Sequence, residues 1–340
     1  IMSDPRLILH AGHPKTGSSA LQSAFALSTD ALAQVGIHYP RPVRDDAARA
    51  GQITSGNFNP ARVVELYDRA LARQPDAAAI LFSNEACFRI YLADPSPLRQ
   101  LGDNGVVTEV ILFVRDPLGL AVSIYSQLLK RGGGVAEFED FLSNFRFMGQ
   151  VERFLGLMRE AEITLKVRNY ARCNDQLLPA TEALLEVPDG TLVPPPVARI
   201  NRSLTRAEMD LMRRLNATLP KGYAARVADA LCHELPLLPG ETPCLSRSGY
   251  DAFAARMRPV LERLNAMLPE ADHLRMEAYD PRFEAATEPA ELCAAQQAVV
   301  DRTLARAASP AARASALKRA TAAAPVLAPL SGLARRLLRR

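Results

Sequence analysis

Short apolar runs alternate along the chain with longer segments whose apolar positions recur every three to four residues. The short runs have the length of buried β-strands, and each ends at a polar or glycine-containing turn. The longer segments have the periodicity of helices that bury one face. The strands predicted in this way are residues 6–10, 79–82, 110–114 and 163–167, and helices lie between them near 18–35, 61–73 and 175–186.

A further helix follows the third predicted strand and begins at Asp116 and Pro117, a favourable N-cap and a residue suited to the first helical turn. Strands that alternate with helices indicate a mainly parallel sheet with helices on both faces. We therefore expect a doubly wound α/β fold. After a proline-rich connection the pattern becomes wholly helical near 206–217, 222–234 and 247–268, which predicts a helical C-terminal cap.

These elements predict two parts of the chain. Residues 1–275 form the α/β domain, which includes the helical cap at about 197–275, and residues 276–340 form a helical, basic and alanine-rich tail. Residues 301–340 contain nine Lys or Arg and one acid, whereas the residues before them contain 32 basic and 36 acidic side chains. A mildly acidic body lacks the basic face of a nucleic-acid binder, so we expect no nucleic-acid partner.

The basic tail has two interpretations. Its leucines from Leu327 to Leu338 can share one side of a helix, and its terminal arginines suit anionic lipid, which predicts peripheral contact with a membrane. The alternative is a frayed, alanine-rich terminus. Five scattered cysteines without metal-ligand spacing are typical of free thiols in a reducing compartment. With no signal peptide or membrane span expected, the protein is predicted to be cytoplasmic, with its tail at the inner face of the membrane.

A glycine-containing turn links the first predicted strand to the first predicted helix. Its two glycines, five positions apart, let the backbone curl, and the helix N-terminus presents unpaired N–H groups to an anion. In ATP-hydrolysing P-loops a lysine directly follows the second glycine, whereas here Ser18 takes that position and Lys15 precedes Gly17. The turn predicts a phosphate site unlike that of an ATPase; an ordinary turn with a solvated lysine is the alternative. It reads Gly12-His13-Pro14-Lys15-Thr16-Gly17-Ser18-Ser19.

A second motif lies where the third predicted strand ends. Arg115 closes the strand, and Ser123 follows eight residues later, two turns into the next helix. Arginine offers a fork of donors and serine one more, so the pair suits a terminal phosphate. The alternative is that Arg115 pairs with Asp116 and that the polar stripe of this largely apolar helix faces water.

Together the two motifs resemble those of sulfotransferases that use 3′-phosphoadenosine-5′-phosphosulfate (PAPS). The run from Pro14 to Ser19 resembles the family's 5′-phosphosulfate loop, and Arg115-Asp116-Pro117 with Ser123 resembles its 3′-phosphate signature. The resemblance is to bacterial, carbohydrate-type members and spans roughly residues 6–270, with specific motifs only in 12–22 and 115–127. It implies a P-loop-like fold, PAPS as co-substrate, 3′-phosphoadenosine-5′-phosphate (PAP) as product, and no metal.

The resemblance also implies roles for individual residues. In that family the lysine contacts the oxygen that links phosphate to sulfate, which gives Lys15 a catalytic role, because charge builds on this oxygen as it leaves. Loop amides and hydroxyls hold the 5′-phosphate. The nucleotide-binding residues implied in this way are Lys15, Thr16, Gly17, Ser18, Ser19, Arg115 and Ser123, with Tyr170 near the adenine.

Glu85 follows the second predicted strand, where several branches of the family carry the general base that takes the acceptor proton. The resemblance therefore implies that role for Glu85. The alternative is that Ser83 or Asn84 caps a helix whose first turn holds Glu85. His13, inside the glycine-containing turn, is a second candidate base.

Tyr170 follows the fourth predicted strand, where the family often has an aromatic ring beside the adenine. A tyrosine packed against the sheet edge is the alternative, because stacking needs only a flat ring. Gly12, Ser83, Arg115 and Tyr170 each directly follow a predicted strand. Ligands of open parallel sheets bind beyond the carboxyl ends of the strands, so we expect a single site there.

The sequence thus predicts an enzyme that transfers a sulfuryl group from PAPS to an acceptor hydroxyl or amine. A glycan hydroxyl is the acceptor that the resemblance implies. One alternative is a P-loop-like kinase that uses ATP and Mg²⁺; the displaced Lys15 and a third strand that ends in Arg115 count against it. Another is a non-catalytic nucleotide-binding protein with a membrane-associating tail.

Overall fold

The structure, a computed structural model, describes residues 6–42, 45–51, 56–196, 202–220, 222–284 and 290–308. The chain divides into two compact units. The first, here called the sheet unit, comprises Ile1–Tyr125, Glu137–Arg199 and Pro243–Ala285. The second, the helical unit, comprises Ser126–Ala136, Ile200–Thr242 and Ala286–Arg340. The leucines and arginines on which the membrane prediction depends lie outside the described residues.

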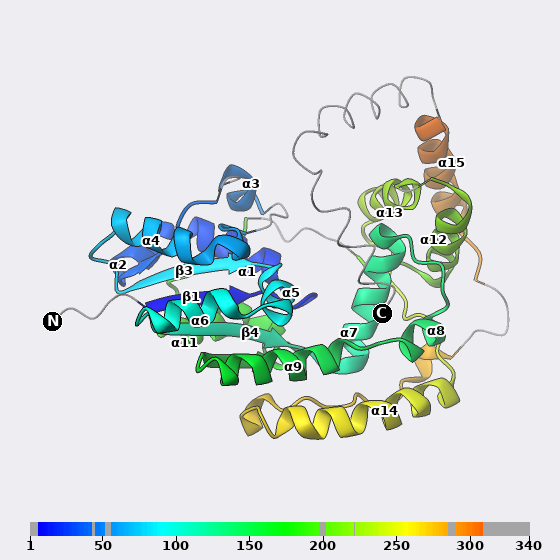
Figure 1. The fold of residues 1–340 in the computed structure, drawn as a ribbon. Helices are drawn as coiled ribbons and strands as arrows, with labels where there is room; N and C mark the ends of the chain where they lie inside the picture. Colours follow the sequence, from blue (N-terminus) through cyan, green and yellow to red (C-terminus); the bar gives the residue numbers. More distant parts are fainter. Residues whose placement is uncertain are drawn as a thin grey trace. The chain divides into compact units, whose positions relative to one another are not determined.

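The sheet unit is built on five parallel strands in the order β2-β3-β1-β4-β5. Strands β3 and β2 lie on one side of β1 within the sheet, and strands β4 and β5 lie on its other side. The order therefore reverses direction at β1, which is the switch point of the topology (Figure 1). This confirms the predicted α/β class with a parallel sheet. The strands are β1 (Arg6–Ala11), β2 (Ile37–His38), β3 (Ala79–Asn84), β4 (Thr108–Val114) and β5 (Thr164–Asn169).

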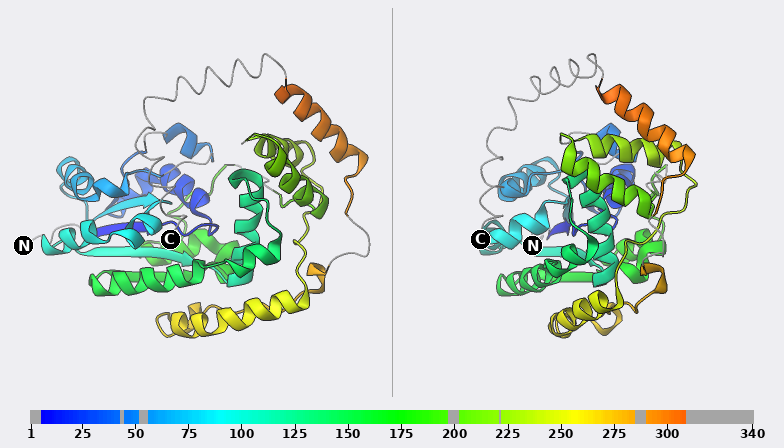
Figure 2. Two further views of the ribbon diagram at one scale, coloured as in Figure 1. Left: turned by 45° about the vertical axis from the view of Figure 1, so that its right-hand side comes forward. Right: turned by 90° about the vertical axis from the view of Figure 1, so that its right-hand side faces the viewer.

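Helices pack on both faces of this sheet. On one face, side chains of β1, β3 and β4 such as Ile8, Leu81 and Phe113 form a core with α1 (Ser18–Leu27), α2 (Thr29–Gln34) and α11 (Leu177–Leu185). The other face is contacted by α4 (Val63–Arg73), α5 (Cys87–Ala93), α6 (Ser96–Asp103) and α9 (Phe147–Glu160). Figures 1 and 2 show α9 running along this face. Because both faces are covered, the central strands β3 and β4 are buried along their whole length and are mostly apolar.

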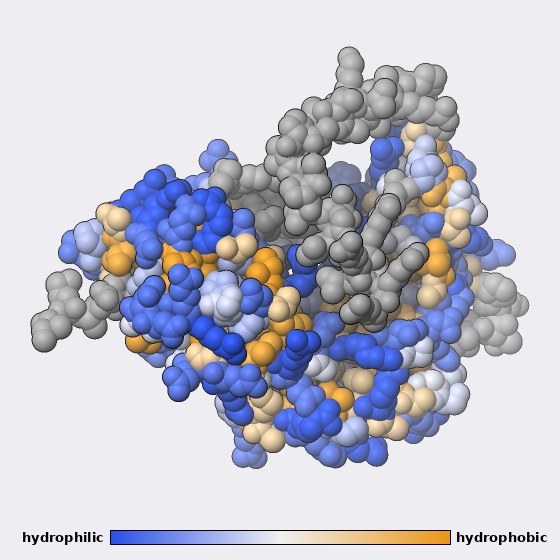
Figure 3. Space-filling view, in the orientation of Figure 1, coloured by the Kyte–Doolittle hydropathy of each residue, from blue (hydrophilic) through white to orange (hydrophobic). Residues whose placement is uncertain are grey.

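The outward sides of these helices are polar, as their sequence period requires. In α4, Val63, Tyr67 and Ala70 are buried, while Glu65 and Arg69 are exposed and form an ion pair. Figure 3 shows the resulting hydrophilic surface, broken by smaller apolar areas. Single apolar residues at a surface are normal. Those most exposed among the described residues are Val35, Val107, Val135, Val193 and Leu237.

The prediction of one helix over 18–35 is wrong, because the chain breaks between α1 and α2 at Ser28. The buried Ser28 hydroxyl accepts the Val193 N–H at 2.7 Å, so this position serves a connection far along the sequence. A short helix, α3 (Asp45–Arg49), lies in a stretch of the chain where no element is predicted. The helix predicted at 61–73 begins as a short 3₁₀ turn at Pro60–Arg62 and continues as α4.

The three helices predicted as one C-terminal cap divide between the two units. The long helix α14 (Arg247–Asn265) contacts α8 (Phe138–Ser143) and α9 in the sheet unit. By contrast α12 (Arg206–Thr218) and α13 (Tyr223–Glu234) belong with α15 (Ala294–Ala308), which was predicted as tail. The predicted boundary near 275 therefore does not coincide with the division into units.

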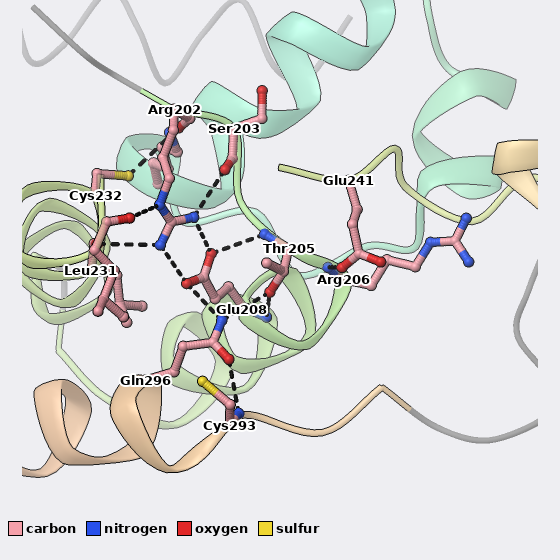
Figure 4. A network of polar contacts seen from close by, with 12 residues as sticks. Arg202, Ser203, Thr205, Arg206, Glu208, Leu231, Cys232, Glu241, Cys293 and Gln296 are labelled. Atoms are coloured by element: carbon pink, nitrogen blue, oxygen red, sulfur yellow. Dashed lines mark hydrogen bonds and ion pairs between the residues drawn. The ribbon is translucent and has the colours of Figure 1, made fainter. Parts of the chain in front are cut away.

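A buried ion pair organises the helical unit. Arg202 donates two hydrogen bonds to the carboxylate of Glu208, at 2.7 and 2.8 Å, and both side chains are almost fully buried. Arg202 also donates to the carbonyls of Leu231 and Leu235, which ties α12 to α13. From α15, Gln296 donates to Glu208 at 2.9 Å (Figure 4). One carboxylate thus connects three helices.

The Glu208 carboxylate also forms a capping box with Thr205 at the start of α12. Thr205 N–H donates to Glu208 at 2.9 Å, and Glu208 N–H donates to the Thr205 hydroxyl at 3.3 Å. Burial alone raises the pKa of Glu208, but hydrogen bonds from Arg202, Gln296 and Thr205 outweigh it, so that the pKa lies below its ordinary value. The charged form is therefore favoured in the folded protein.

We predict that Glu208→Ala destabilises the helical unit by about 3–5 kcal/mol, because Arg202 would remain buried without its partner. The matched control is Arg302→Ala, which breaks a half-exposed ion pair with Glu234 in the same unit. This control should change the free energy of unfolding by no more than about 1 kcal/mol. Urea denaturation of the full chain measures both variants, and equal losses would contradict the prediction.

The Glu208 contribution also has a defined pH dependence. Its pKa is lowered on folding, so the stabilisation is fully present above the unfolded value of about 4.3 and is lost as the pH falls through the folded value. The difference in unfolding free energy between the wild type and Glu208→Ala should shrink in that acidic range.

Candidate functional site

The turn between β1 and α1 has the backbone of an anion site. Lys15 and Gly17 have positive φ angles of 67° and 79°, on either side of Thr16. Alternation between left-handed and other backbone conformations directs successive N–H groups toward one point. The Thr16 hydroxyl donates to the His13 carbonyl at 2.7 Å and closes the turn from inside. Because this hydroxyl has a single proton, we expect Thr16 to meet a phosphate through its backbone N–H.

The N-terminus of α1 is open to a ligand. Its N-cap is Gly17, which has no side chain to cap the helix, and its first turn contains no acid. The N–H groups of a first helical turn have no acceptor within the helix. Ser18 is buried and Ser19 half-buried, both in this first turn. Backbone donors and the positive end of the helix dipole therefore meet at the loop.

Gly17 also allows the end of β5 to approach the loop closely. A Cβ atom at Gly17 would lie 2.5 Å from Cδ2 of Leu177 and 3.2 Å from Cε2 of Tyr170. The ring of Tyr170 therefore lies directly against the turn. The structure brings Tyr170 to the predicted site, where it packs against the loop.

Arg115 connects the second motif to the first. Its NH1 donates to the carbonyl of Lys15 at 3.3 Å, and its guanidinium lies 5.7 Å from the centre of the Tyr170 ring. Three of the predicted residues, from the ends of β1, β4 and β5, thus meet at the carboxyl edge of the sheet. The alternative in which Arg115 pairs with Asp116 does not describe the structure, since Asp116 accepts instead from Asn169 and from the Arg275 N–H.

Ser123 lies in α7 (Pro117–Gln127), four residues after Gly119, and residues four apart share a helix face. A Cβ at Gly119 would lie 3.4 Å from Nε and NH2 of Arg115. Ser123 is half-buried one turn further along this face.

Glu85 lies beside the same loop. The Ser19 hydroxyl donates to its carboxylate at 3.4 Å, a long hydrogen bond. Gly12 permits this approach, because a Cβ there would lie 2.8 Å from Cα of Glu85. The carboxyl reaches the surface, yet surrounding protein raises its pKa above the ordinary value, while Ser19 and Lys15 act in the opposite direction. The Asn84 side chain accepts the Ala86 N–H in the turn after β3, but α5 begins at Cys87 with Ala86 as its N-cap, so Asn84 does not cap the helix and Glu85 does not lie in its first turn.

His13, the other candidate base, is buried among apolar groups. Its ring packs edge-on against Phe88, with ring centres 5.1 Å apart, and neither ring nitrogen has a hydrogen-bond partner among the described residues. Burial lowers its pKa to about 3, so the ring is neutral near pH 7. A base with this pKa has little driving force to take a proton, which favours Glu85 for that role.

The sequence analysis missed a segment that crosses the ends of β4 and β5. Asp272 is buried and accepts from the Asn169 N–H at 2.9 Å and from Arg168 at 3.0 Å. Asn169 and Asp116 link this segment to the start of α7. The linked residues lie 53 to 159 positions apart in sequence, and no local pattern relates them.

Glu277, in the same segment, fills the N-terminus of α7. Its carboxylate accepts the N–H groups of Leu118 at 3.0 Å and of Gly119 at 2.6 Å. Burial raises its pKa, the two backbone donors oppose the shift, and the nearby Asp116 adds to it. The helix after β4 is thus closed by a carboxylate, whereas the helix after β1 is open.

The chain matches no protein-family model and no curated protein sequence. Across the described residues, no group of three or more His, Cys, Asp and Glu side chains is arranged to hold a metal ion. Within the same part of the chain, no helix combines the length and apolar character needed to span a bilayer.

We predict that Gly17→Ala destabilises the protein by at least about 1–2 kcal/mol, because a left-handed alanine is strained and its methyl group would collide with Leu177. The matched control is Gly156→Ala in the middle of α9, where a Cβ has no atom within 4 Å. This control should stabilise the protein by about 0.5–1 kcal/mol, because alanine favours helix. Thermal denaturation of both variants tests the pair; a neutral Gly17→Ala would contradict the geometry.

Proposed function

We propose that the protein is a PAPS-dependent sulfotransferase that transfers a sulfuryl group to an acceptor hydroxyl or amine, with a glycan hydroxyl as the first candidate acceptor. The observation that carries this proposal is the hydrogen bond from Arg115 to the carbonyl of Lys15. It brings together two phosphate-binding motifs that lie about one hundred residues apart in sequence.

The loop after β1 supports binding of the 5′-phosphosulfate and with it a P-loop-like fold. Backbone donors at Thr16, Gly17, Ser18 and Ser19 surround the start of α1, where an anion is stabilised by the helix dipole. Lys15 neutralises charge on the phosphate oxygen that leaves in the reaction. The adenine lies by Tyr170, whose ring contacts this loop.

The 3′-phosphate binds Arg115 and Ser123. Arg115 has one hydrogen bond within the described residues, to the Lys15 carbonyl, and an arginine carries five N–H donors. The remaining donors suit a phosphate, and Ser123 adds a hydroxyl on the facing side of α7. PAPS and PAP carry this phosphate and ATP does not, which distinguishes the proposal from the kinase alternative.

The transfer step uses few groups. The acceptor oxygen or nitrogen attacks sulfur, its proton passes to Glu85, and the bond between sulfur and the bridging phosphate oxygen breaks. The electron pair stays on that oxygen, where Lys15 stabilises it, and PAP is the product. The raised pKa of Glu85 suits a base, because it lies closer to neutrality than that of an ordinary carboxyl.

We predict that the protein binds PAP without any metal and binds ATP poorly with or without Mg²⁺. Arg115→Ala should weaken PAP binding by roughly 1.5–3 kcal/mol, the range for a hydrogen bond to a charged group, and leave ATP binding unchanged. Arg153→Ala, at an exposed position of α9, is the matched control and should bind PAP normally. Calorimetry with and without chelator measures all of these affinities. Tighter binding of ATP with Mg²⁺ than of PAP would replace this proposal with the kinase alternative.

We predict that Glu85→Gln lowers turnover by about a hundredfold or more, the effect of losing a general base, with little change in PAP affinity. The acceptor is found first, by screening glycans and other hydroxyl- and amine-bearing compounds with labelled PAPS. Glu65→Gln on α4, an exposed glutamate, is the control and should leave turnover unchanged. Normal turnover in Glu85→Gln rejects Glu85 as the base.

The wild-type pH profile is a second test of the base. A general base must be ionised, so turnover should fall as the pH drops through the raised pKa of Glu85. The acidic limb should therefore lie above the range of an unperturbed glutamate.

A further inference from the structure

Glu277 lies on the boundary of the proposed 3′-phosphate site. Its Oε1 lies 3.0 Å from the position that a Cβ of Gly119 would occupy, and Nε and NH2 of Arg115 lie 3.4 Å from the same point. The carboxylate is held there by the N–H groups of Leu118 and Gly119. Glu277 and Arg115 thus both lie near the same point on α7, where Gly119 has no side chain.

The position of this carboxylate is fixed by the surrounding chain. The Tyr250 hydroxyl donates to the backbone carbonyl of Glu277 at 2.6 Å, and the Arg275 N–H donates to Asp116 at 2.9 Å. The backbone of Glu277 is held in this way, and its side chain cannot turn away from Arg115 without breaking its two hydrogen bonds at the start of α7. A phosphate that binds Arg115 from this side has to bind in the field of Glu277.

We propose that Glu277 is a specificity-determining residue of the nucleotide site, whose negative charge opposes a phosphate at Arg115 and which takes up a proton when that phosphate binds. This inference rests on the proposed binding of PAP. In the ligand-free protein the carboxylate satisfies two N–H groups of α7. In the complex the protonated group can still accept these bonds while it no longer repels the ligand.

The charges around Glu277 determine the direction of this effect. Arg115 lies across Gly119 from the carboxylate. The N–H groups of Leu118 and Gly119 favour its ionised form, while the nearby Asp116 disfavours it; Tyr250 bonds only the backbone carbonyl, and the side chain of Arg275 is exposed. Burial has already raised the pKa of Glu277. A bound phosphate adds negative charge and raises the pKa further. Proton uptake should therefore accompany binding, and PAP affinity should rise as the pH falls.

The same charge acts on a nucleotide that carries a 3′-phosphate and has no effect on one that lacks it. Adenosine 5′-monophosphate differs from PAP only in that its ribose 3′-oxygen carries no phosphate, so it places no anion at Arg115. Removing the charge of Glu277 should therefore affect PAP and leave adenosine 5′-monophosphate unchanged. A role confined to capping α7 would alter the binding of both nucleotides alike.

The experiment compares wild-type protein with Glu277→Gln by calorimetry, with both nucleotides. Each titration is run in two buffers of different ionisation enthalpy, which counts protons taken up on binding. We expect Glu277→Gln to bind PAP about tenfold tighter or more above neutral pH, the scale of an interaction between close charges. It should also take up fewer protons than the wild type. Binding of adenosine 5′-monophosphate should not change.

Two controls isolate the contribution of Glu277. The 3′-phosphate titrates near pH 6 by itself, but it does so in both proteins and cancels in their difference. Glu270→Gln, an exposed change in the same segment, should behave as the wild type. Above about pH 7, where the 3′-phosphate stays ionised, the pH dependence of PAP affinity in wild-type protein tests the proposal even if Glu277→Gln does not fold: an affinity that does not rise as the pH falls toward neutrality overturns it.

The outcomes separate this inference from the proposed function. If the wild type binds PAP but Glu277→Gln shows the same affinity and the same proton uptake, the inference is wrong and the proposed function stands. Weaker binding of both nucleotides to Glu277→Gln also overturns it, since that result means a capping role only. If the wild type does not bind PAP, both proposals fail.

Discussion

The site depends on the left-handed backbone at Gly17, where the chain passes from β1 into α1. This conformation leaves the N-terminus of α1 without a side-chain cap and lets Tyr170 and Leu177 pack directly against the turn. A serine or aspartate N-cap typically stabilises a helix by about 1 kcal/mol, and α1 lacks this stabilisation because its N-cap is Gly17. Its first turn lies at the carboxyl edge of the sheet, beside Glu85, which accepts the Ser19 hydroxyl.

The arrangement of the strands explains why these residues meet. With β1 in the centre of the sheet, the ends of β3 and β4 lie on either side of it, so that Glu85 and Arg115 flank the same loop. Gly12 allows Glu85 to lie close to the loop, and the carbonyl of Lys15 accepts a hydrogen bond from Arg115. A parallel sheet places the carboxyl ends of its strands at one edge. Close packing at this edge requires glycine at positions 12 and 17 of the turn after β1.

Much of this could be predicted from the sequence, because the strands are continuous apolar runs and the turn has a local signature. The break at Ser28 could not, since its hydroxyl serves Val193, which lies 165 residues away. Strand β2 has only two residues and thus no period to detect. Helix α9, in contrast, carries a regular apolar face, so its sequence did contain a signal that was overlooked.

The sequence predicted the candidate site residues that belong to a motif, and it missed the residues that position the backbone around them. Asp272 and Glu277 lie near or beyond the predicted domain boundary, and their partners Asn169 and Gly119 are more than one hundred residues upstream. From the sequence alone, Asp272 and Glu277 are indistinguishable from exposed acids, because their partners at a strand end and a helix start are distant in sequence. Sequence patterns report local constraints, and these contacts are not local.

The two helices that start beside the site, α1 and α7, differ in whether a side chain binds the free N–H groups of the first turn. At α7 the free N–H groups are taken by Glu277, while at α1 the first turn has no acid and its N-cap has no side chain. In the proposed complex, the 5′-phosphosulfate would meet the uncapped N-terminus of α1, and the 3′-phosphate would depend on the side chains of Arg115 and Ser123 near α7. A helix terminus attracts any anion, whereas a fork of donors beside a carboxylate has to hold a phosphate against the repulsion of that carboxylate. The two ends of the proposed ligand would therefore be bound by different physical means, the backbone of α1 at one end and an arginine side chain at the other.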